Sequence, residues 1–199
     1  MTEFLGKLIK ARPTPLANQY VLDTCEKPSA GENTLLYKLQ NSKSFTHIQT
    51  AAECMDHMAA GIDTTGDALC FLLYQLSQPE TWYVQSKLQQ EFKVSQGKSL
   101  DDLPYLDAVV KEGLRCFPPI PMSQPRYVPE GGRTIDGYFI PAGTIVSAQA
   151  WSVHRLNEDV FVEGEKYIPE RWLDEKKNVE MNRVFFAFGL GARGCIGRQ

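Results

Sequence analysis

The sequence predicts a mainly α-helical fold with a small antiparallel β-sheet, an α+β chain of 199 residues. From about Phe45 to Gln78, apolar side chains recur at the three- and four-residue spacing of an amphipathic helix. From Arg133 to Ala148, β-branched and aromatic residues instead form short runs. The dipeptides Asp136-Gly137 and Ala142-Gly143 interrupt these runs, which is typical of tight hairpins.

Helices are expected on both sides of this sheet. The first 45 residues mix prolines and polar residues with short apolar pieces, which predicts one or two short helices joined by loops. The long helix at 45–78 follows. A second helix is expected after Pro79, with Trp82 and Leu88 among its apolar positions, and a loop through Gly97 ends it.

A third helix is expected to begin near Pro104, because proline is tolerated in a first turn. Asp101 and Asp102 are expected to cap this helix. After the hairpins, the sequence predicts a short helix from Trp151 to Leu156 and then a turn at "IPERW", residues 168–172.

Composition excludes several classes of protein. The net charge is -3, and the Lys and Arg residues are spread along the chain, so no nucleic-acid partner is expected. The five cysteines form no C-x-x-C pair, which favours a reduced, intracellular chain without a zinc site. The longest apolar run, Ala68 to Tyr74, is far below the roughly 18 to 20 residues that cross a bilayer, so no membrane segment is expected in this chain.

The stretch "FAFGLGARGCIG", Phe186 to Gly197, allows two interpretations. Its glycines match G-x-G-x-x-G, the spacing of a dinucleotide site. Such a site needs a helix of several turns and an acidic residue about 20 positions further on, whereas only five residues follow Gly194. The alternative is a glycine-rich loop that presents the thiolate of Cys195, and the rest of the chain favours it.

The pattern F-G-x-G-x-R-x-C-x-G resembles the ligand loop of the cytochrome P-450 (haem-thiolate) superfamily. Its matched positions are Phe188, Gly189, Gly191, Arg193, Cys195 and Gly197. The resemblance extends to "AGIDTT" at 60–65, "EGLR" at 112–115 and "PERW" at 169–172, in the order that the family shows. The chain is thereby identified as a member, of the eukaryotic, fungal-like type.

The resemblance implies a partial cytochrome P-450 fold. Its parts would be the long distal helix, the Glu-x-x-Arg helix, β-hairpins, a meander and the Cys ligand loop. Residues 1–199 would form a single partial catalytic domain. The N-terminal half of that domain, and the helix that follows the Cys loop in the family, are expected to be missing.

The implied cofactor is haem b (iron protoporphyrin IX), with the Cys195 thiolate as the axial ligand of the iron. Phe188 would shield the sulfur, and glycines such as Gly189 would let the loop turn sharply. Arg193 and Arg126 would each hold a haem propionate.

The long helix carries the implied catalytic groups. Gly61 and two threonines in mid-helix each weaken it by roughly 0.5 to 1 kcal/mol relative to alanine. The Thr64 hydroxyl can reach the Ala60 carbonyl and open the helix locally. In the family this opening, beside Ala60 and Gly61, is the dioxygen groove, where Thr64 and Asp63 would manage protons.

The resemblance also implies a structural ion-pair network and residues of the substrate pocket. Glu112 and Arg115, with Arg171 of "PERW", would form the family's structural Glu-Arg-Arg network. Ile120 and Met122 would line the substrate pocket.

The implied function is a haem-dependent monooxygenase, an oxidoreductase that activates dioxygen to oxidise an apolar organic substrate. Electrons would come from a separate NADPH-dependent reductase, so NADPH would act only indirectly. The full-length parent would lie on the cytoplasmic face of the endoplasmic reticulum. One alternative is a non-catalytic truncated product that cannot retain haem. Another is isomerisation or dehydration at the same centre, although Thr64 and Asp63 favour oxygen activation.

Overall fold

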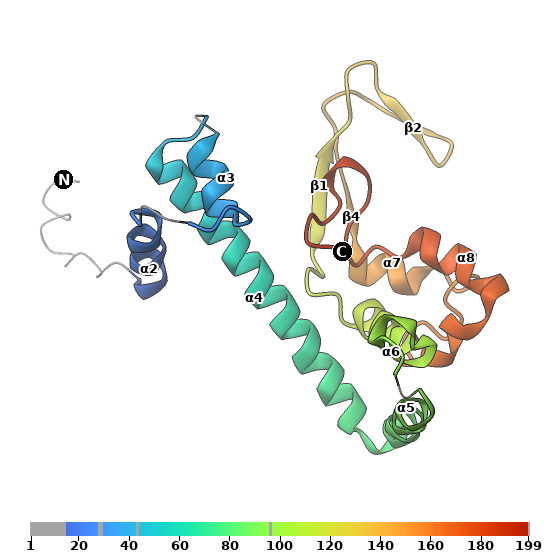
Figure 1. Cartoon of the computed structure of the whole chain (residues 1–199). Helices are drawn as coiled ribbons and strands as arrows, with labels where there is room; N and C mark the ends of the chain where they lie inside the picture. Colours follow the sequence, from blue (N-terminus) through green and yellow to red (C-terminus); the bar gives the residue numbers. More distant parts are fainter. Residues whose placement is uncertain (1–14, 28–29, 43, 96, 199) are drawn as a thin grey trace, which may run out of the picture. The chain divides into compact units, whose positions relative to one another are not determined.

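The computed structural model describes residues 15–27, 30–42, 44–95 and 97–198 (Figure 1). The described residues form two compact units, which divide after Asp63. Helices dominate, and the strands form two short antiparallel pairs. The mainly α-helical class with a small antiparallel β component is therefore confirmed.

The first unit contains α2 (Leu16–Cys25), α3 (Leu35–Asn41) and the first half of α4 (His47–Ser77). Thr34 caps α3, because its hydroxyl oxygen accepts a hydrogen bond from the Tyr37 N–H at 3.2 Å. Apolar residues of all three helices pack together; the buried ones are Val21, Cys25 and Ala51. The expected short helices before residue 45 are confirmed for the described residues.

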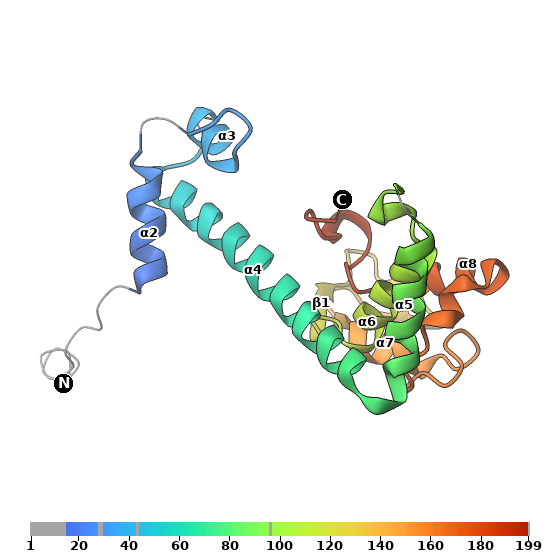
Figure 2. The ribbon, with the colours of Figure 1, turned by 60° about the horizontal axis from the view of Figure 1, so that its bottom comes forward.

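The second unit begins with the rest of α4, which is one continuous helix as the periodicity predicts (Figure 1). Next come η1 (Pro79–Thr81), α5 (Trp82–Val94), η2 (Leu100–Asp102) and α6 (Pro104–Cys116). In Figure 1, α6 lies between α5 and α7 (Ala150–Leu156), and α6 contacts each of them; the three helices also lie together in Figure 2. The second, third and last of the expected helices are thereby confirmed.

The expected cap of the third helix is wrong. Asp101 and Asp102 lie in η2, and no side chain caps α6 from its N-cap position. The Glu91 carboxylate of α5 instead accepts hydrogen bonds from the N–H groups of Tyr105 at 2.7 Å and Leu106 at 2.9 Å. A residue from another helix thus satisfies the free amides of the first turn, which local sequence spacing does not reveal.

Of the two expected hairpins, one forms. β2 (Arg133–Ile135) pairs with β3 (Tyr138–Ile140) across Asp136 and Gly137, whose φ angles of 50° and 80° suit a two-residue turn.

The second expected hairpin, at Ala142-Gly143, is wrong. The chain turns there, with Gly143 at φ 77°, but the strand that follows, β4 (Ile145–Gln149), pairs with β1 (Ser123–Tyr127) and not with β3. The Gly143 N–H donates to the Val128 carbonyl at 3.0 Å, which extends the β1–β4 ladder. The β component is therefore two strand pairs and not one sheet.

The last part of the chain contains η3 (Pro169–Leu173), α8 (Glu175–Val184) and η4 (Gly191–Arg193). Helix α8 was not predicted, because its sequence lacks a clear apolar stripe. Its start is set by Asp174, whose carboxylate accepts from the N–H groups of Lys176 and Lys177.

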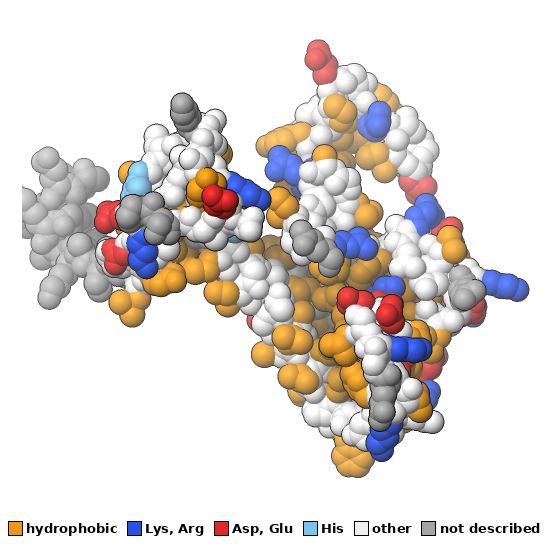
Figure 3. Space-filling model, viewed as in Figure 1, with side chains coloured by type: hydrophobic (Ala, Val, Ile, Leu, Met, Phe, Trp, Pro, Cys, Tyr) orange, Lys and Arg blue, Asp and Glu red, His pale blue; other side chains and the backbone are white. Residues whose placement is uncertain are grey.

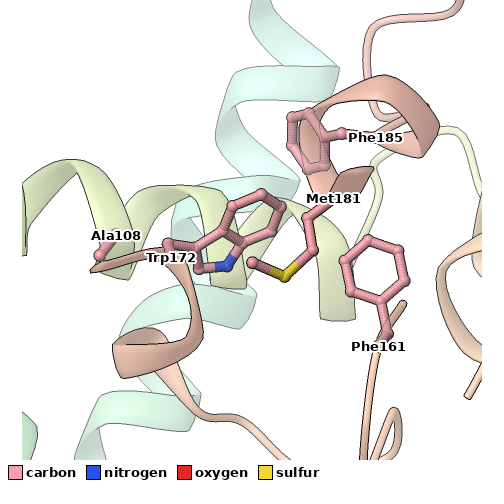
Figure 4. Packing of buried hydrophobic residues seen from close by; sticks show 5 residues of the cluster. All are labelled: Ala108, Phe161, Trp172, Met181 and Phe185. Atoms are coloured by element: carbon pink, nitrogen blue, oxygen red, sulfur yellow. The ribbon is translucent and has the colours of Figure 1, made fainter. Parts of the chain in front are cut away.

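The main core of the second unit joins α6, η3 and α8. Its buried members are Ala108, Phe161, Trp172, Met181 and Phe185 (Figure 4). The Trp172 and Phe185 rings meet edge to face with centroids 5.4 Å apart. This core fixes the segment from which the glycine-rich loop emerges.

Candidate active site: a thiol loop on an apolar cavity

The second unit contains a cavity of about 440 Å³. Its walls come from the C-terminal half of α4, from α6, from the segment after α6 and from the glycine-rich loop. In the space-filling view, hydrophobic side chains gather over the C-terminal half of α4 and in the recess beside it (Figure 3). The lining residues are Thr64, Thr65, Ala68, Leu69, Leu72, Val110, Gly113, Leu114, Pro119, Ile120, Gln124, Ala187, Phe188, Gly189, Arg193 and Cys195.

The glycine-rich loop folds back on itself. The Cys195 N–H donates to the Phe188 carbonyl at 2.7 Å, and the Gly189 N–H donates to the Phe186 carbonyl at 3.0 Å. Gly189 and Gly191 have φ angles of 65° and 66°, which favour glycine over any other residue. This turn brings four of the sequence-predicted cofactor residues to the cavity: Phe188, Gly189, Arg193 and Cys195.

Of the catalytic and dioxygen-groove residues expected on helix α4, only some lie on the cavity. Thr64 lies on the cavity together with Leu69 and Leu72. Asp63, which precedes it on the same helix, is exposed. Ala60 and Gly61 also lie before the division between the units, are exposed, and are not among the lining residues. The structure therefore brings Thr64 and Cys195 to one cavity.

Of the residues expected to contact the substrate or the second haem propionate, one lies on the cavity and two do not. Ile120 lines the cavity, whereas Met122 is 64% exposed and does not. Arg126 is exposed on β1, and its guanidinium donates to the carbonyl of Pro125 at 2.8 Å. Arg126 is not among the lining residues.

Next to the lining residue Gly113 on α6, the Glu112 carboxylate is fully buried and joins α6 to η3. It accepts hydrogen bonds from both Arg115 and Arg171, the latter from Nε at 3.0 Å. The indole N–H of Trp172 and the backbone N–H of Ile168 donate to the same carboxylate at 2.9 Å each. The expected Glu-Arg-Arg contacts are thus present in the structure.

Arg115 is equally buried, and its charge is also offset by carbonyl groups. Its guanidinium donates to the carbonyl oxygens of His154 at 3.0 Å, Gly164 at 2.7 Å and Lys166 at 2.9 Å. A buried charge needs such partners, because an unpaired one costs several kcal/mol. The network therefore anchors α6 to α7 and to the segment before η3.

The other face of α6 meets α4 at the cavity. A Cβ atom on Gly113 would lie 2.9 Å from Cδ1 of Leu72, closer than real contacts allow. Both residues line the cavity. The side chain of Leu72 therefore packs directly on Gly113, and its flexible end would have to shift to accommodate a methyl group there.

A family model described as Cytochrome P450 matches residues 1–199 of the chain. The chain belongs to the cytochrome P450 family. A cytochrome P450 monooxygenase of Aspergillus terreus is 40% identical over 162 residues, which cover 75% of this chain and 32% of that protein. A cytochrome P450 monooxygenase of Aspergillus niger is 35% identical over 91% of this chain and 37% of its own length. Pisatin demethylase of Fusarium vanettenii is 36% identical, over 85% and 34% respectively.

The chain therefore spans about a third of the length of these P450 relatives. The expected membership of the cytochrome P450 family, with fungal relatives, is thereby confirmed. Among the helices of the described ranges, none is both long and apolar enough to cross a membrane.

Three residues that help to hold the helices and the glycine-rich loop around the cavity were not predicted from the sequence. Trp172 is part of "PERW", but the motif does not indicate that its indole N–H donates to the Glu112 carboxylate. Gly113 stands in "EGLR", and the motif gives no sign that Leu72 of α4 packs on it. His154 is fully buried, and nothing in its sequence neighbourhood shows that it would contact both α6 and the loop.

Proposed function

We propose that this chain carries the haem-thiolate centre of a P450 monooxygenase that oxidises an apolar organic substrate. The observation that carries the proposal is the shared cavity, on which the Cys195 loop and Thr64 both lie. A thiolate ligand favours oxygen activation at haem, and a hydroxyl on the same cavity can take part in proton transfer.

The lining residues fit haem b. Cys195 is a free thiol on the cavity and would be the axial ligand of the iron. Arg193 offers a cation for one propionate, and Leu69, Leu72 and Leu114 offer apolar surface for the ring. No cluster of three or more His, Cys, Asp or Glu residues forms a competing metal site in the described ranges.

When bound, haem with a thiolate ligand supplies dioxygen activation, because the sulfur pushes electron density towards O–O cleavage. The protein's part is to hold and shield the sulfur. The hydrogen bond from the Cys195 N–H to the Phe188 carbonyl fixes the loop, and the Phe188 ring would keep water from the sulfur.

Thr64 and Asp63 would handle protons on the opposite side of the cavity. The Thr64 hydroxyl would hold a proton at Oγ1, and the exposed Asp63 carboxylate would exchange protons with solvent. Ala60 and Gly61 would allow the helix to open beside them. Arg126 would serve the second propionate, which requires its side chain to leave the Pro125 carbonyl.

The substrate would be apolar because the lining is mostly aliphatic and aromatic. Ile120 would contact it, and Met122 would do so only after moving. Electrons would come from a separate NADPH-dependent reductase. Residues 1–199 would act as part of one catalytic domain, with the Glu112 network as its structural frame.

Reconstitution tests this proposal. The chain is mixed with haemin, reduced under carbon monoxide, and its Soret band is recorded. We expect the red-shifted band of a thiolate complex, and its loss in Cys195→Ser. Cys70→Ser is the matched control, since Cys70 is an exposed cysteine of α4 that does not line the cavity. A chain that binds no haem, or a thiolate band that survives in Cys195→Ser, would overturn the proposal.

A further inference from the structure

His154 links the end of α6 to the start of the Cys195 loop. It lies on α7 and is fully buried. Its Nδ1 lies 3.0 Å from the carbonyl oxygen of Arg115, and its Nε2 accepts a hydrogen bond from the Phe186 N–H at 2.8 Å. Arg115 belongs to the last turn of α6, and Phe186 begins the loop segment.

The two contacts determine the protonation of the ring. A backbone N–H can only donate, so Nε2 must present its lone pair to Phe186. A carbonyl oxygen can only accept, so Nδ1 must carry the proton that binds Arg115. His154 is therefore neutral, with its proton on Nδ1.

The surroundings maintain this neutral form. Burial lowers the pKa of His154 to about 4, and the positive charges of Arg115 and Arg155 act in the same direction. The hydrogen bond to the Arg115 carbonyl, and to a lesser extent the charge of Glu112 on α6, raise the pKa but do not outweigh burial. The ring also stacks on Phe185 with centroids 5.4 Å apart and an interplanar angle of 13°, which restricts its rotation.

Two backbone hydrogen bonds connect Phe186, the residue that His154 holds, to the rest of the Cys195 loop. The carbonyl of Phe186 accepts from the Gly189 N–H, and the carbonyl of Phe188 accepts from the Cys195 N–H. Fixing the Phe186 amide therefore fixes the first of the two turns that place Cys195 on the cavity.

We propose that His154 is a positioning residue of the Cys195 loop, which it holds to α6 by donating from Nδ1 and accepting at Nε2. The loop contact itself does not depend on haem. The consequence for ligation of the iron by Cys195 rests on the proposed function.

Three variants separate the two nitrogens. In His154→Gln, the side-chain amide reaches the position of Nε2 and can still accept from Phe186. In His154→Asn, the shorter amide reaches the position of Nδ1 and leaves the Phe186 N–H without an acceptor. His154→Phe keeps the ring stacking on Phe185 and removes both hydrogen bonds.

The first readout is hydrogen exchange of the Phe186 amide, measured by NMR in the haem-free chain. We expect exchange about tenfold faster in His154→Asn and His154→Phe, because the lost hydrogen bond allows local opening, and near-wild-type exchange in His154→Gln. Tyr105→Phe is the control, since it removes a hydrogen bond to Glu170 in the same unit, away from the loop. Equal exchange in His154→Gln and His154→Asn would overturn the proposal.

The second readout is the fraction of thiolate-type carbon monoxide complex after loading with haem. This fraction should fall in His154→Asn and His154→Phe, and it should recover in His154→Gln. If the wild-type chain takes up no haem, the proposed function fails, while the exchange experiment still decides the role of His154. Unchanged exchange in His154→Asn would refute that role whatever the haem experiment shows.

Discussion

At the residue scale, the Glu112 carboxylate is the centre of a buried ion-pair network. It is fully buried and pairs with Arg115, which is also fully buried, and with Arg171. The same separation of three residues occurs in the exposed pair Glu180 and Arg183, whose atoms lie 2.9 Å apart. The sequence spacing of the two pairs is therefore equal, whereas their burial and the number of groups bound to the carboxylate differ.

Glu112→Gln should lower the free energy of unfolding by about 3 to 5 kcal/mol, because it leaves the buried charge of Arg115 without its counter-ion. Glu180→Gln, the surface control, should lower it by less than about 1 kcal/mol. Urea unfolding at pH 7 measures both values. Equal effects of the two substitutions would show that burial does not govern the network.

The neutral His154 should make the chain sensitive to mild acid. Its pKa in the folded state is about 4, below the usual 6.5, so the unfolded chain binds the proton first as the pH falls. Stability is therefore fully present above pH 6.5 and is lost towards pH 4, at up to about 1.4 kcal/mol per pH unit. The charged groups acting on the ring are Arg115, Arg155 and Glu112.

Urea unfolding at pH 7, 6 and 5 checks this prediction. The free energy of unfolding should depend less steeply on pH in His154→Phe than in the wild type, because the variant lacks the one proton that the unfolded wild-type chain takes up at this position. The same slope in the variant and the wild type would assign the acid sensitivity to other groups.

At the scale of elements, the predictable features were those encoded locally. The period of α4, the Asp136-Gly137 turn and the helix after Pro104 follow from neighbouring residues, and all three are found. The cap of α6 and the partner of β4 depend on Glu91 and on β1, which lie far away in sequence. Local patterns therefore could not predict them.

Gly113 offers a test of how α6 meets α4. Gly113→Ala should place a methyl group 2.9 Å from Leu72 Cδ1 and push that side chain towards the cavity. Because Cδ1 is the end of a flexible side chain, Leu72 can turn aside, so Gly113→Ala should gain less stability than the helix propensity of alanine alone would give, and Leu72→Val should restore part of the difference. Gly66→Ala is the matched control, because a Cβ there meets nothing within 4 Å, and it should stabilise α4 by up to about 1 kcal/mol.

Thermal unfolding of the single and double variants provides the measurement. A gain in Gly113→Ala as large as that in Gly66→Ala would show that Leu72 turns aside without strain.

At the scale of the whole molecule, the sequence identified the loop, the network and the family, because each has a motif of several fixed positions. It did not reveal His154, since a lone histidine on a short helix has no spacing that indicates its two partners. Residues such as Arg126 and Met122 carried an expected role but lie off the cavity. A motif thus predicts residue types in order, whereas side-chain direction depends on the assembled structure.

The central claim is that the sulfur of Cys195 binds iron on the cavity that Thr64 also lines. X-ray absorption at the iron edge of the haem-loaded chain measures this bond directly. We predict an iron–sulfur contribution in the wild type and in Cys70→Ser that is absent in Cys195→Ser. Iron coordinated by nitrogen and oxygen alone in the wild type, or sulfur coordination that remains in Cys195→Ser, would contradict the claim.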